Sequence, residues 1–360
     1  MLHFLWSGYP LCENSYSIYE FSNLEIAKWA EYYLSQKTSF HQSSWSAGKV
    51  TDHPDDILLG HLTWHPTNAI AESSQGKFIR NWVKDNAIYP DQLCHPNTYV
   101  LTPWVPDFPI EWTTNMPWLE FQLLQSKKIF ALCGEVWIER TLAKCDNSIQ
   151  SQVKEKLVHC NMGIAAQNFH IYKKKFNKVG AREILHVSNL GSYKGFDLTC
   201  KSLINLDTIL YVASPVQLNI GMNRLVIDNE EFFFRFLGNI NNNDPKINSL
   251  IVDTCDFYIH TATMDAQATT ILENCARGLI PLITPESGFS SPHAIYLTHD
   301  YLENRKIIEW ALNLSEEELL NRSHLLREQI FREHSWDKIF GTIWNEIKQD
   351  IDSRKSLNNI

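Results

Sequence analysis

Residues 252–284 decide the fold of this chain; they read VDTCDFYIHTATMDAQATTILENCARGLIPLIT. The short apolar run at 257–259 predicts a buried strand, and residues 268–276 have the apolar spacing of a helix. Gly278 stands where a glycine commonly follows a helix, and residues 279–283 read as a second buried strand. The stretch therefore predicts a strand, a loop, a helix and a parallel strand.

Two acidic residues lie in this stretch: Asp265 in the loop before the helix and Glu273 on the helix itself. Carboxylates accept hydrogen bonds from hydroxyl groups, and the free amides at a helix N-terminus receive phosphate or sugar oxygens. The pattern indicates a ligand that is both polyhydroxylated and anionic. The alternative is an ordinary strand–helix–strand unit with a capping aspartate and a surface glutamate.

The same stretch resembles the donor-site motif of retaining glycosyltransferases with the GT-B fold, the group-1 family that uses nucleotide sugars. In that family two glutamates flank seven residues and precede a glycine and a Pro-Val-Ile strand. Here Asp265 and Glu273 occupy the two acid positions. Ala266 and Ala268 replace the usual glycine pair, so the chain resembles a divergent member.

A second segment, residues 184–197, reads ILHVSNLGSYKGFD and resembles the strand, loop and Lys-Gly-x-Asp helix start of the same family. In the family an Arg in the loop and the Lys hold the diphosphate of the donor. Lys194 matches that Lys, whereas Asn189 stands at the Arg position. Asn can donate a hydrogen bond but carries no charge, so the grip on the diphosphate or the donor type is expected to differ.

Weaker matches follow in the family's order between residues 158 and 345. Residues 158–164, followed by Phe169, resemble the hinge between the two domains, with Ala165 where Asp is usual. Gly238 ends a segment that resembles the strand whose backbone contacts the nucleotide base. Residues 286–288 resemble the small-residue loop after the last strand of the motif, and Ser335 and Trp336 resemble the start of the final helix.

The first half of the chain also alternates strands with helices. Strand-like runs lie at 2–6, 55–61, 99–101 and 129–132, and helical patterns lie at 24–34 and 76–83. This order predicts a doubly wound parallel sheet. With the resemblance, we expect an α/β protein of the GT-B fold, with two Rossmann-like domains facing across a cleft. The domains are expected at 1–164 (acceptor side) and 165–335 (nucleotide sugar), with a closing helix and tail at 336–360.

Parallel sheets bind ligands at the carboxyl ends of their strands. Gly8 follows the first strand and could let the backbone approach a donor phosphate or an acceptor; the alternative is a simple tight turn. His61 ends another strand, and by position it is our candidate for contact with the donor sugar, against the alternative of a structural histidine. The His61 and His65 spacing also admits a metal site, but neither a helix nor an intervening Glu supports it.

The composition of the chain limits the classes of protein to which it can belong. The hydrophobic content of 44% and charged content of 20% are those of a globular protein. A net charge of −9 argues against nucleic acid as a partner. The eight cysteines form no CxxC pair, and no apolar run has the roughly 20 residues of a membrane span, which favours a cytoplasmic protein with reduced thiols. The lysine run at 173–175 is either a solvated connector or a contact with anionic lipid headgroups.

The resemblance implies retaining transfer of a hexose from a UDP- or GDP-linked sugar to a hydroxyl, with no obligatory metal and no further cofactor. The acceptor would be carbohydrate-bearing or lipid-linked. Lys194 would neutralise the leaving diphosphate, Asp265 and the amides of Ala266 and Gln267 would hold the donor sugar, and Glu273 would bind the ribose. The alternatives are a protein that binds sugars or a partner without transfer, and a nucleotide-sugar epimerase.

Overall fold

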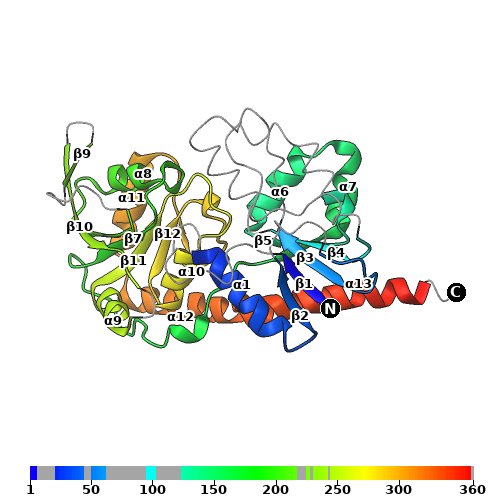
Figure 1. The fold of residues 1–360 in the computed structure, drawn as a ribbon. Coiled ribbons are helices and arrows are strands. Elements are labelled where there is room, and N and C mark those ends of the chain that lie inside the picture. The colour runs from blue at the N-terminus through cyan, green and yellow to red at the C-terminus, as the bar shows by residue number, and fades with distance from the viewer. Residues whose placement is uncertain are drawn as a thin grey trace. The chain divides into compact units, whose positions relative to one another are not determined.

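The structure is a computed structural model, and it describes residues 1–5, 21–43, 50–61, 95–102, 123–216, 224–227, 230–241 and 244–357 (Figure 1). The chain forms two compact units. The first comprises Met1–Met162 and Trp336–Ile360, and the second comprises Gly163–Ser335. Gly8, His65 and the helix predicted at 76–83 lie outside the described residues.

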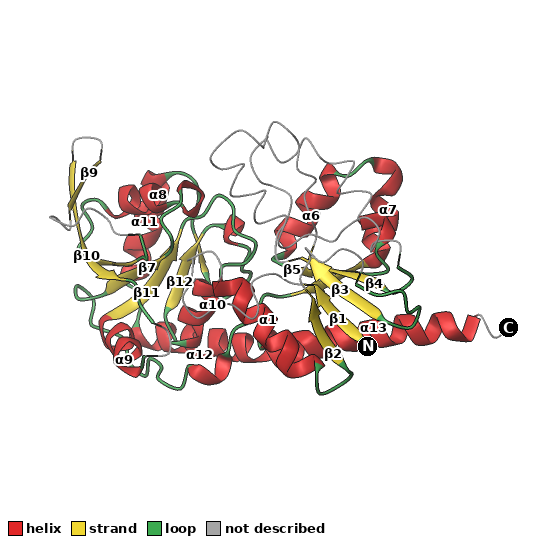
Figure 2. Cartoon of the chain, viewed as in Figure 1, coloured by secondary structure: helices red, strands yellow, loops and turns green. Residues whose placement is uncertain are grey.

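The first unit is built on a six-stranded parallel sheet with the order β2-β1-β3-β4-β5-β6 (Figure 2). Its strands are β1 (Leu2–Leu5), β2 (Phe40–Ser43), β3 (Ile57–His61), β4 (Thr98–Thr102), β5 (Ile129–Leu132) and β6 (Leu157–Cys160). Its helices are α1 (Phe21–Leu34), α6 (Glu135–Lys144), α7 (Asn147–Lys156) and α13 (Trp336–Leu357). Apolar side chains of neighbouring strands and of α7 form a shared core that includes Leu5, Leu58, Val100, Ile129 and Val153.

The last helix, α13, belongs to this first unit and packs against α1 and β6. Its apolar face (Ile339, Phe340, Ile343 and Ile347) is buried. Polar contacts add to that face: Tyr99 donates a hydrogen bond to Asp350 at 2.6 Å, and Lys128 forms an ion pair with Glu346. Helix α13 begins at Trp336.

The second unit is built on a seven-stranded sheet with the order β13-β12-β11-β7-β8-β10-β9, in which β9 alone runs antiparallel to its neighbour. Its strands are β7 (Glu183–Val187), β8 (Leu210–Ala213), β9 (Arg224–Ile227), β10 (Glu230–Gly238), β11 (Cys255–His260), β12 (Ile280–Ile283) and β13 (Ile295–Tyr296). Its helices are α8 (Phe196–Leu203), α9 (Pro245–Thr254), α10 (Thr269–Ala276), α11 (Tyr301–Leu312) and α12 (Glu316–Glu333), with the short 3₁₀ helices η2 (Ala166–Asn168), η3 (Ser192–Lys194) and η4 (Pro285–Ser287). Helix α8 packs with α11, and α10 packs with α12.

The strand order of the second unit creates one topological switch point. From β7 the chain proceeds outward through β8 and β10, and it then returns to place β11 on the other side of β7 before continuing to β12 and β13. Loops that leave β7 and β11 therefore diverge to opposite sides of the sheet. In open α/β sheets a ligand binds at such a point, outside the carboxyl ends of the strands.

The predicted strands and the α/β class are confirmed, and the strand, loop, helix and strand of the opening stretch appear as β11, α10 and β12. The helix ends before Gly278, whose φ of 86° is readily adopted by glycine. In the first unit, strands β2 and β6 and helices α6 and α7 were not predicted; in the second unit, strands β8, β9 and β13 and helices α9, α11 and α12 were not. Within the part of the chain that the structure describes, no helix is both long enough and apolar enough to cross a bilayer.

The expectation that the lysines at 173–175 are solvated or contact lipid headgroups is wrong for Lys173. Lys174 and Lys175 are exposed, but Lys173 is buried and its ammonium pairs with Asp256 at 2.8 Å. The same ammonium donates to the carbonyls of Val252 and Cys255, both at 2.9 Å, at the end of α9. Lys173 is therefore a buried helix cap rather than a solvated or lipid-binding residue.

Candidate functional site

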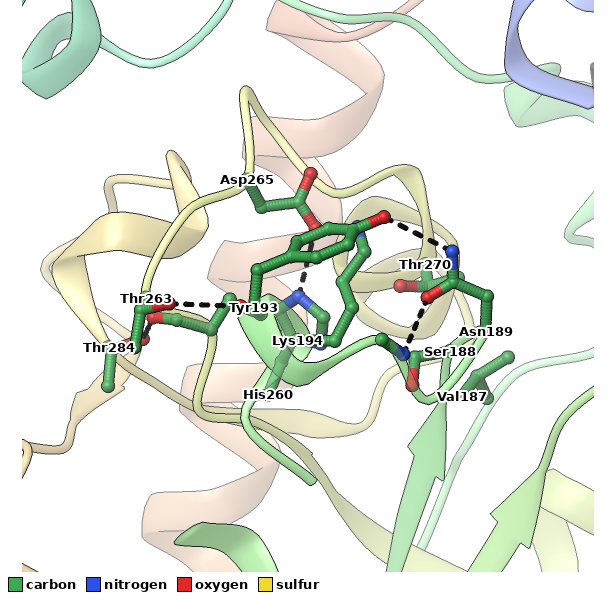
Figure 3. Close-up of polar contacts among 12 residues, drawn as sticks. Val187, Ser188, Asn189, Tyr193, Lys194, His260, Thr263, Asp265, Thr270 and Thr284 are labelled. Atoms are coloured by element: carbon green, nitrogen blue, oxygen red, sulfur yellow. Dashed lines mark hydrogen bonds and ion pairs between the residues drawn. The ribbon is translucent and has the colours of Figure 1, made fainter. Parts of the chain in front are cut away.

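Lys194 and Asp265 meet at the switch point. Lys194 ends η3 in the loop after β7, and Asp265 lies in the loop after β11. The ammonium of Lys194 forms an ion pair with Oδ2 of Asp265 (Figure 3). The Lys194 side chain retains 18% of its exposure and that of Asp265 retains 9%, so the pair borders solvent. Two residues separated by 71 positions in the sequence are thus brought to one site.

A chain of hydrogen bonds shapes the loop after β7. The buried His186 donates from Nδ1 to the carbonyl of Ile259 at 3.0 Å, because a carbonyl can only accept. Its Nε2 then accepts from the hydroxyl of Ser188 at 2.8 Å, and that oxygen accepts from the amide of Leu190 at 3.0 Å. Burial lowers the pKa of His186 to about 3, with a smaller effect of His260, so the ring is neutral as this pattern requires. Leu190 has a φ of 57°, which is uncommon for a residue with a Cβ.

Asn189 serves the same loop. Its Oδ1 accepts a hydrogen bond from the amide of Gly191 at 3.1 Å, and its Nδ2 donates to the hydroxyl of Tyr193 at 3.1 Å (Figure 3). The first contact is an Asx turn, in which a side chain replaces a backbone group. The position that resembles a diphosphate-binding Arg is therefore occupied by a residue that holds the loop in shape.

The loops after β7 and β11 are locked together. The amide of Thr263 donates to the carbonyl of Tyr193 at 2.9 Å, and the hydroxyl of Thr261 donates to the carbonyl of Gly195 at 2.6 Å. Gly195 has a φ of 72°, and a Cβ at this position would clash with the carbonyl of Thr261. This close approach explains why a glycine follows Lys194, and it fixes Lys194 relative to Asp265.

Asp265 is held from three sides. Its amide donates to the carbonyl of Glu286 in the loop after β12 at 2.9 Å, and Nε2 of His260 lies 3.0 Å from its Oδ2. Burial by itself would raise the pKa of Asp265, but the Lys194 ammonium and the His260 ring together keep it below its usual value. The carboxylate is therefore ionised at neutral pH and can accept hydrogen bonds from hydroxyl groups.

A polar cluster beneath the site connects β11 to α10. The hydroxyl of Tyr258 donates to the carbonyl of Val187 at 3.1 Å and lies 2.7 Å from the hydroxyl of Thr270, which is the second residue of α10. The Tyr258 and His260 rings lie 6.1 Å apart at an interplanar angle of 18°. These contacts position the start of α10 against the ends of the two central strands.

The other proposed donor-site residues of the second unit lie around this centre. Glu273 is on α10, three residues after Thr270 and four before the buried Arg277. Ala266 and Gln267 precede the N-cap Ala268, so their amides belong to the turn before α10 and not to its first turn. The Gln267 side chain is buried and donates to the carbonyl of Gly288 at 3.2 Å.

Two proposed residues lie further away along the fold. Gly238 ends β10, two strands from β7, where its φ of 71° accompanies a shift in register against β8. His61 is the last residue of β3 and belongs to the first unit. Both stand at the carboxyl end of a strand, as the sequence predicts. Their roles stay predictions.

Sequence reasoning missed three residues that build the site: Tyr193, His260 and Thr261. Each lies next to or near a residue that was identified. Tyr193 and Thr261 act through a partner on the other loop, and His260 acts through Asp265 in the loop that follows its own strand. His260 had one local signal, since it is a titratable residue that ends an otherwise largely apolar buried strand five positions before Asp265. Among the described residues, no group of three His, Cys, Asp or Glu side chains is arranged to hold a metal ion.

No protein-family model matches the chain, and no curated protein matches it. Solved structures do. A UDP-forming α,α-trehalose-phosphate synthase from Burkholderia xenovorans is 14% identical, with 93% of this chain and 80% of that chain covered at a TM-score of 0.54. An α,α-trehalose 6-phosphate synthase from Burkholderia multivorans is 11% identical, with 96% and 78% covered at a TM-score of 0.58.

A third structural neighbour is a point mutant of TarM from S. aureus, in complex with fondaparinux, α-GlcNAc-glycerol and UDP. It is 12% identical at a TM-score of 0.53, and the match covers 89% of this chain but 58% of TarM. At these identities the likeness establishes the fold alone. The chain therefore has the α/β fold of the GT-B type that the sequence predicts, built of two Rossmann-like units, and its second unit brings Lys194 and Asp265 together at the switch point.

Proposed function

We propose that the chain is a glycosyltransferase that moves a hexose from a nucleotide sugar to an acceptor hydroxyl with retention, without an obligatory metal. The donor would bind in the second unit, at the loops after β7 and β11. The observation that carries this proposal is the pair formed by Lys194 and Asp265. It supplies one cation and one hydrogen-bond acceptor, both bordering solvent, at the switch point of a fold shared with enzymes that form or bind UDP.

Lys194 suits the diphosphate of the donor. In transfer, the bond from the sugar's anomeric carbon to the diphosphate oxygen breaks and leaves its electron pair on the diphosphate. A positive group already in place stabilises that developing charge without reorganisation, and such groups are usually the largest catalytic contribution. The acceptor oxygen bonds to the same carbon on the same face, and the hydroxyl proton leaves with the nucleoside diphosphate. The likeness of the motif around Asp265 and Glu273 supports retention.

The two acids suit the hydroxyl groups of the donor. Asp265 is ionised and aimed at the site, so it would accept hydrogen bonds from the sugar, with the turn at Ala266 and Gln267 beside it. Glu273 would bind the ribose, and the backbone at Gly238 the base. His61 and Gly8 would contribute from the first unit. We assign UDP as the first nucleotide to test, because the neighbours' ligands and products include it, with GDP as the alternative.

A carbohydrate-bearing or lipid-linked hydroxyl compound would be the acceptor. One observation favours a second function, binding without transfer. Asn189 is engaged within its own loop and brings no charge, so this position does not supply the second cation expected beside the diphosphate. A site with one cation in place of two would bind a diphosphate more weakly and stabilise its departure less.

Titration calorimetry with UDP, GDP and ADP, and with their sugar conjugates, tests the donor site. We expect one nucleotide family to bind, and Lys194→Ala to weaken binding of the nucleoside diphosphate by about 10- to 100-fold, because a hydrogen bond between charged groups is lost. Glu273→Ala should weaken the binding of nucleosides as well as that of nucleoside diphosphates. Lys306→Ala is the matched control, because Lys306 is an exposed lysine on α11 of the same unit.

Turnover separates the two functions. Release of free nucleoside diphosphate from the bound donor, with an acceptor mixture present, supports transfer. Binding without release over hours supports the second function. Unchanged nucleotide affinity in both the Lys194 and the Glu273 variants would remove the donor site from the loops after β7 and β11.

A further inference from the structure

His260 has the geometry of a residue that controls Asp265. It is the last residue of β11, its side chain is 1% exposed, and its Nε2 lies 3.0 Å from Oδ2 of Asp265. A carboxylate can only accept, so Nε2 carries the proton and donates. Burial lowers the pKa of His260, and the attraction of Asp265 only partly offsets this, so a neutral ring with its proton on Nε2 fits the site.

His260 and Lys194 bind the same oxygen of Asp265. The two donors differ in freedom. The imidazole is buried beside the Tyr258 ring and the His186 ring, whose centres both lie 6.1 Å away. The ammonium lies at the end of a flexible side chain that borders solvent. A diphosphate that attracts Lys194 would therefore take one donor from Asp265 and leave the other in place.

We propose that His260 is a positioning residue, which keeps the Asp265 carboxylate charged and oriented toward a donor-sugar hydroxyl while Lys194 turns to the diphosphate. This inference rests on the proposed function. It assigns to His260 a role in sugar binding that is separate from diphosphate binding. Without His260, a carboxylate this buried would take up a proton more readily once Lys194 had moved away, and a protonated acid is a poorer acceptor.

Two substitutions separate the hydrogen bond from the shape of the side chain. His260→Leu removes the donor and keeps an apolar filling at the end of the strand. His260→Gln carries an amide N–H at a reach similar to that of Nε2. Ser323→Ala is the matched control, because it removes a buried hydrogen bond (2.8 Å, to the carbonyl of Gly278) elsewhere in the same unit. Urea unfolding of each variant establishes that it is folded under the conditions of the assay.

The readout is the ratio of affinities for UDP-glucose and UDP, measured by calorimetry. By analogy with metal sites, where removing the partner that orients a metal ligand costs about 10- to 100-fold, we expect His260→Leu to weaken UDP-glucose binding by about that factor. Binding of UDP should change by less than about twofold. His260→Gln should recover most of the loss. Equal weakening of both ligands, or no change in either, would overturn the inference. If GDP is the bound nucleotide, GDP-glucose and GDP replace them.

Asp265 titration gives a second readout that does not depend on the donor. Several titratable or charged groups face Asp265 or the residues that hold it: Lys194, His186, Tyr258, Glu273, Glu286 and His299. Carbon-13 NMR of the aspartate carboxylates should show a higher pKa for Asp265 in His260→Leu than in the unmodified chain, and a smaller rise in His260→Gln. An unchanged Asp265 pKa would overturn the inference. If no nucleotide binds the unmodified chain, the proposed function fails, while this titration still tests whether His260 controls the carboxylate.

Discussion

The two ends of β11 each hold a lysine–aspartate pair, and the pairs differ in how completely the lysine is satisfied. At the start of the strand, Lys173 pairs with Asp256, and their side chains are 2% and 0% exposed. All three hydrogen-bond positions of that ammonium are used, by Asp256 and two carbonyls. At the end of the strand, Lys194 pairs with Asp265, with 18% and 9% exposed.

The difference indicates which pair can serve a ligand. The ammonium of Lys173 has no unused hydrogen-bond donor and is closed off from solvent, so it cannot bind a ligand. Its pair with Asp256 instead connects the end of α9 to the sheet. Among the described residues, the Lys194 ammonium donates a hydrogen bond to Asp265 and lies 5.1 Å from the centre of the Tyr193 ring. A lysine with donors to spare at a switch point can exchange one anion for another, which a capped and enclosed lysine cannot.

Replacing the two lysines by methionine should separate the pairs most strongly. Lys173→Met leaves Asp256 buried without its cation, and we expect the free energy of unfolding to fall by about 3–5 kcal/mol. Lys194→Met should cost about 1–2 kcal/mol, because His260 still donates to Asp265. Urea denaturation measures both, and equal losses would contradict the assignment of one structural pair and one functional pair.

Two glycines with positive φ test how rigidly the functional pair is held. Gly180 and Gly195 have φ values of 82° and 72°, but a Cβ at Gly180 would meet no atom within 4 Å, whereas at Gly195 it would clash with Thr261. Gly180→Ala should cost about 1 kcal/mol, the backbone strain alone. Gly195→Ala should cost at least about 2 kcal/mol more, since the clash adds to the strain, and it should weaken nucleotide binding. Similar losses of unfolding free energy in the two variants would show that the loops after β7 and β11 can move apart at little energetic cost.

Acid titration of stability examines Asp265 itself. The folded pKa of this carboxyl lies below its usual value, so the unfolded chain binds more protons in the interval between the two pKa values. Its contribution to stability is therefore complete above the unfolded pKa, near 4, and is lost as the pH falls through the lower folded pKa. Asp265→Asn should show a shallower loss of stability as the pH falls below about 4. A curve parallel to that of the unmodified chain would contradict this.

The smallest effect is expected at a third lysine–aspartate pair. Lys201 and Asp197 are one helical turn apart on α8, with their charged atoms 3.2 Å apart, and the aspartate side chain is 73% exposed. Pairs of this kind contribute about 0.3–0.5 kcal/mol. Lys201→Ala should therefore change the unfolding free energy by no more than that, and a loss above about 1 kcal/mol would show that contact type, rather than enclosure, governs these pairs.

The local elements of the site could be predicted from the sequence, because each strand, helix and helix end depends on residues that are close together in the chain. The run at 257–259 and Gly278 identified β11 and the end of α10. The contacts between segments were not predictable in this way. Lys173 was taken for a solvated or lipid-binding lysine because its partner, Asp256, lies far along the chain.

The residues around the ion pair illustrate the same limit. Lys194 and Asp265 were identified by resemblance to a known motif, and the structure brings them together. His260 matches no part of that motif, and a histidine at a strand end does not reveal its partner before the loop is folded. Asn189 shows the converse, since its position in the motif indicated a ligand contact while its side chain forms a turn within the loop.

The return of α13 to the first unit has a consequence for synthesis on the ribosome. Residues 163–335 are contiguous and can assemble their sheet as they emerge. The surface of α1 and β6 that packs against α13 stays uncovered until α13 leaves the exit tunnel. The part of the chain made first is thus the part completed last, and throughout the translation of the second unit its apolar surface is available to chaperones or to another nascent chain.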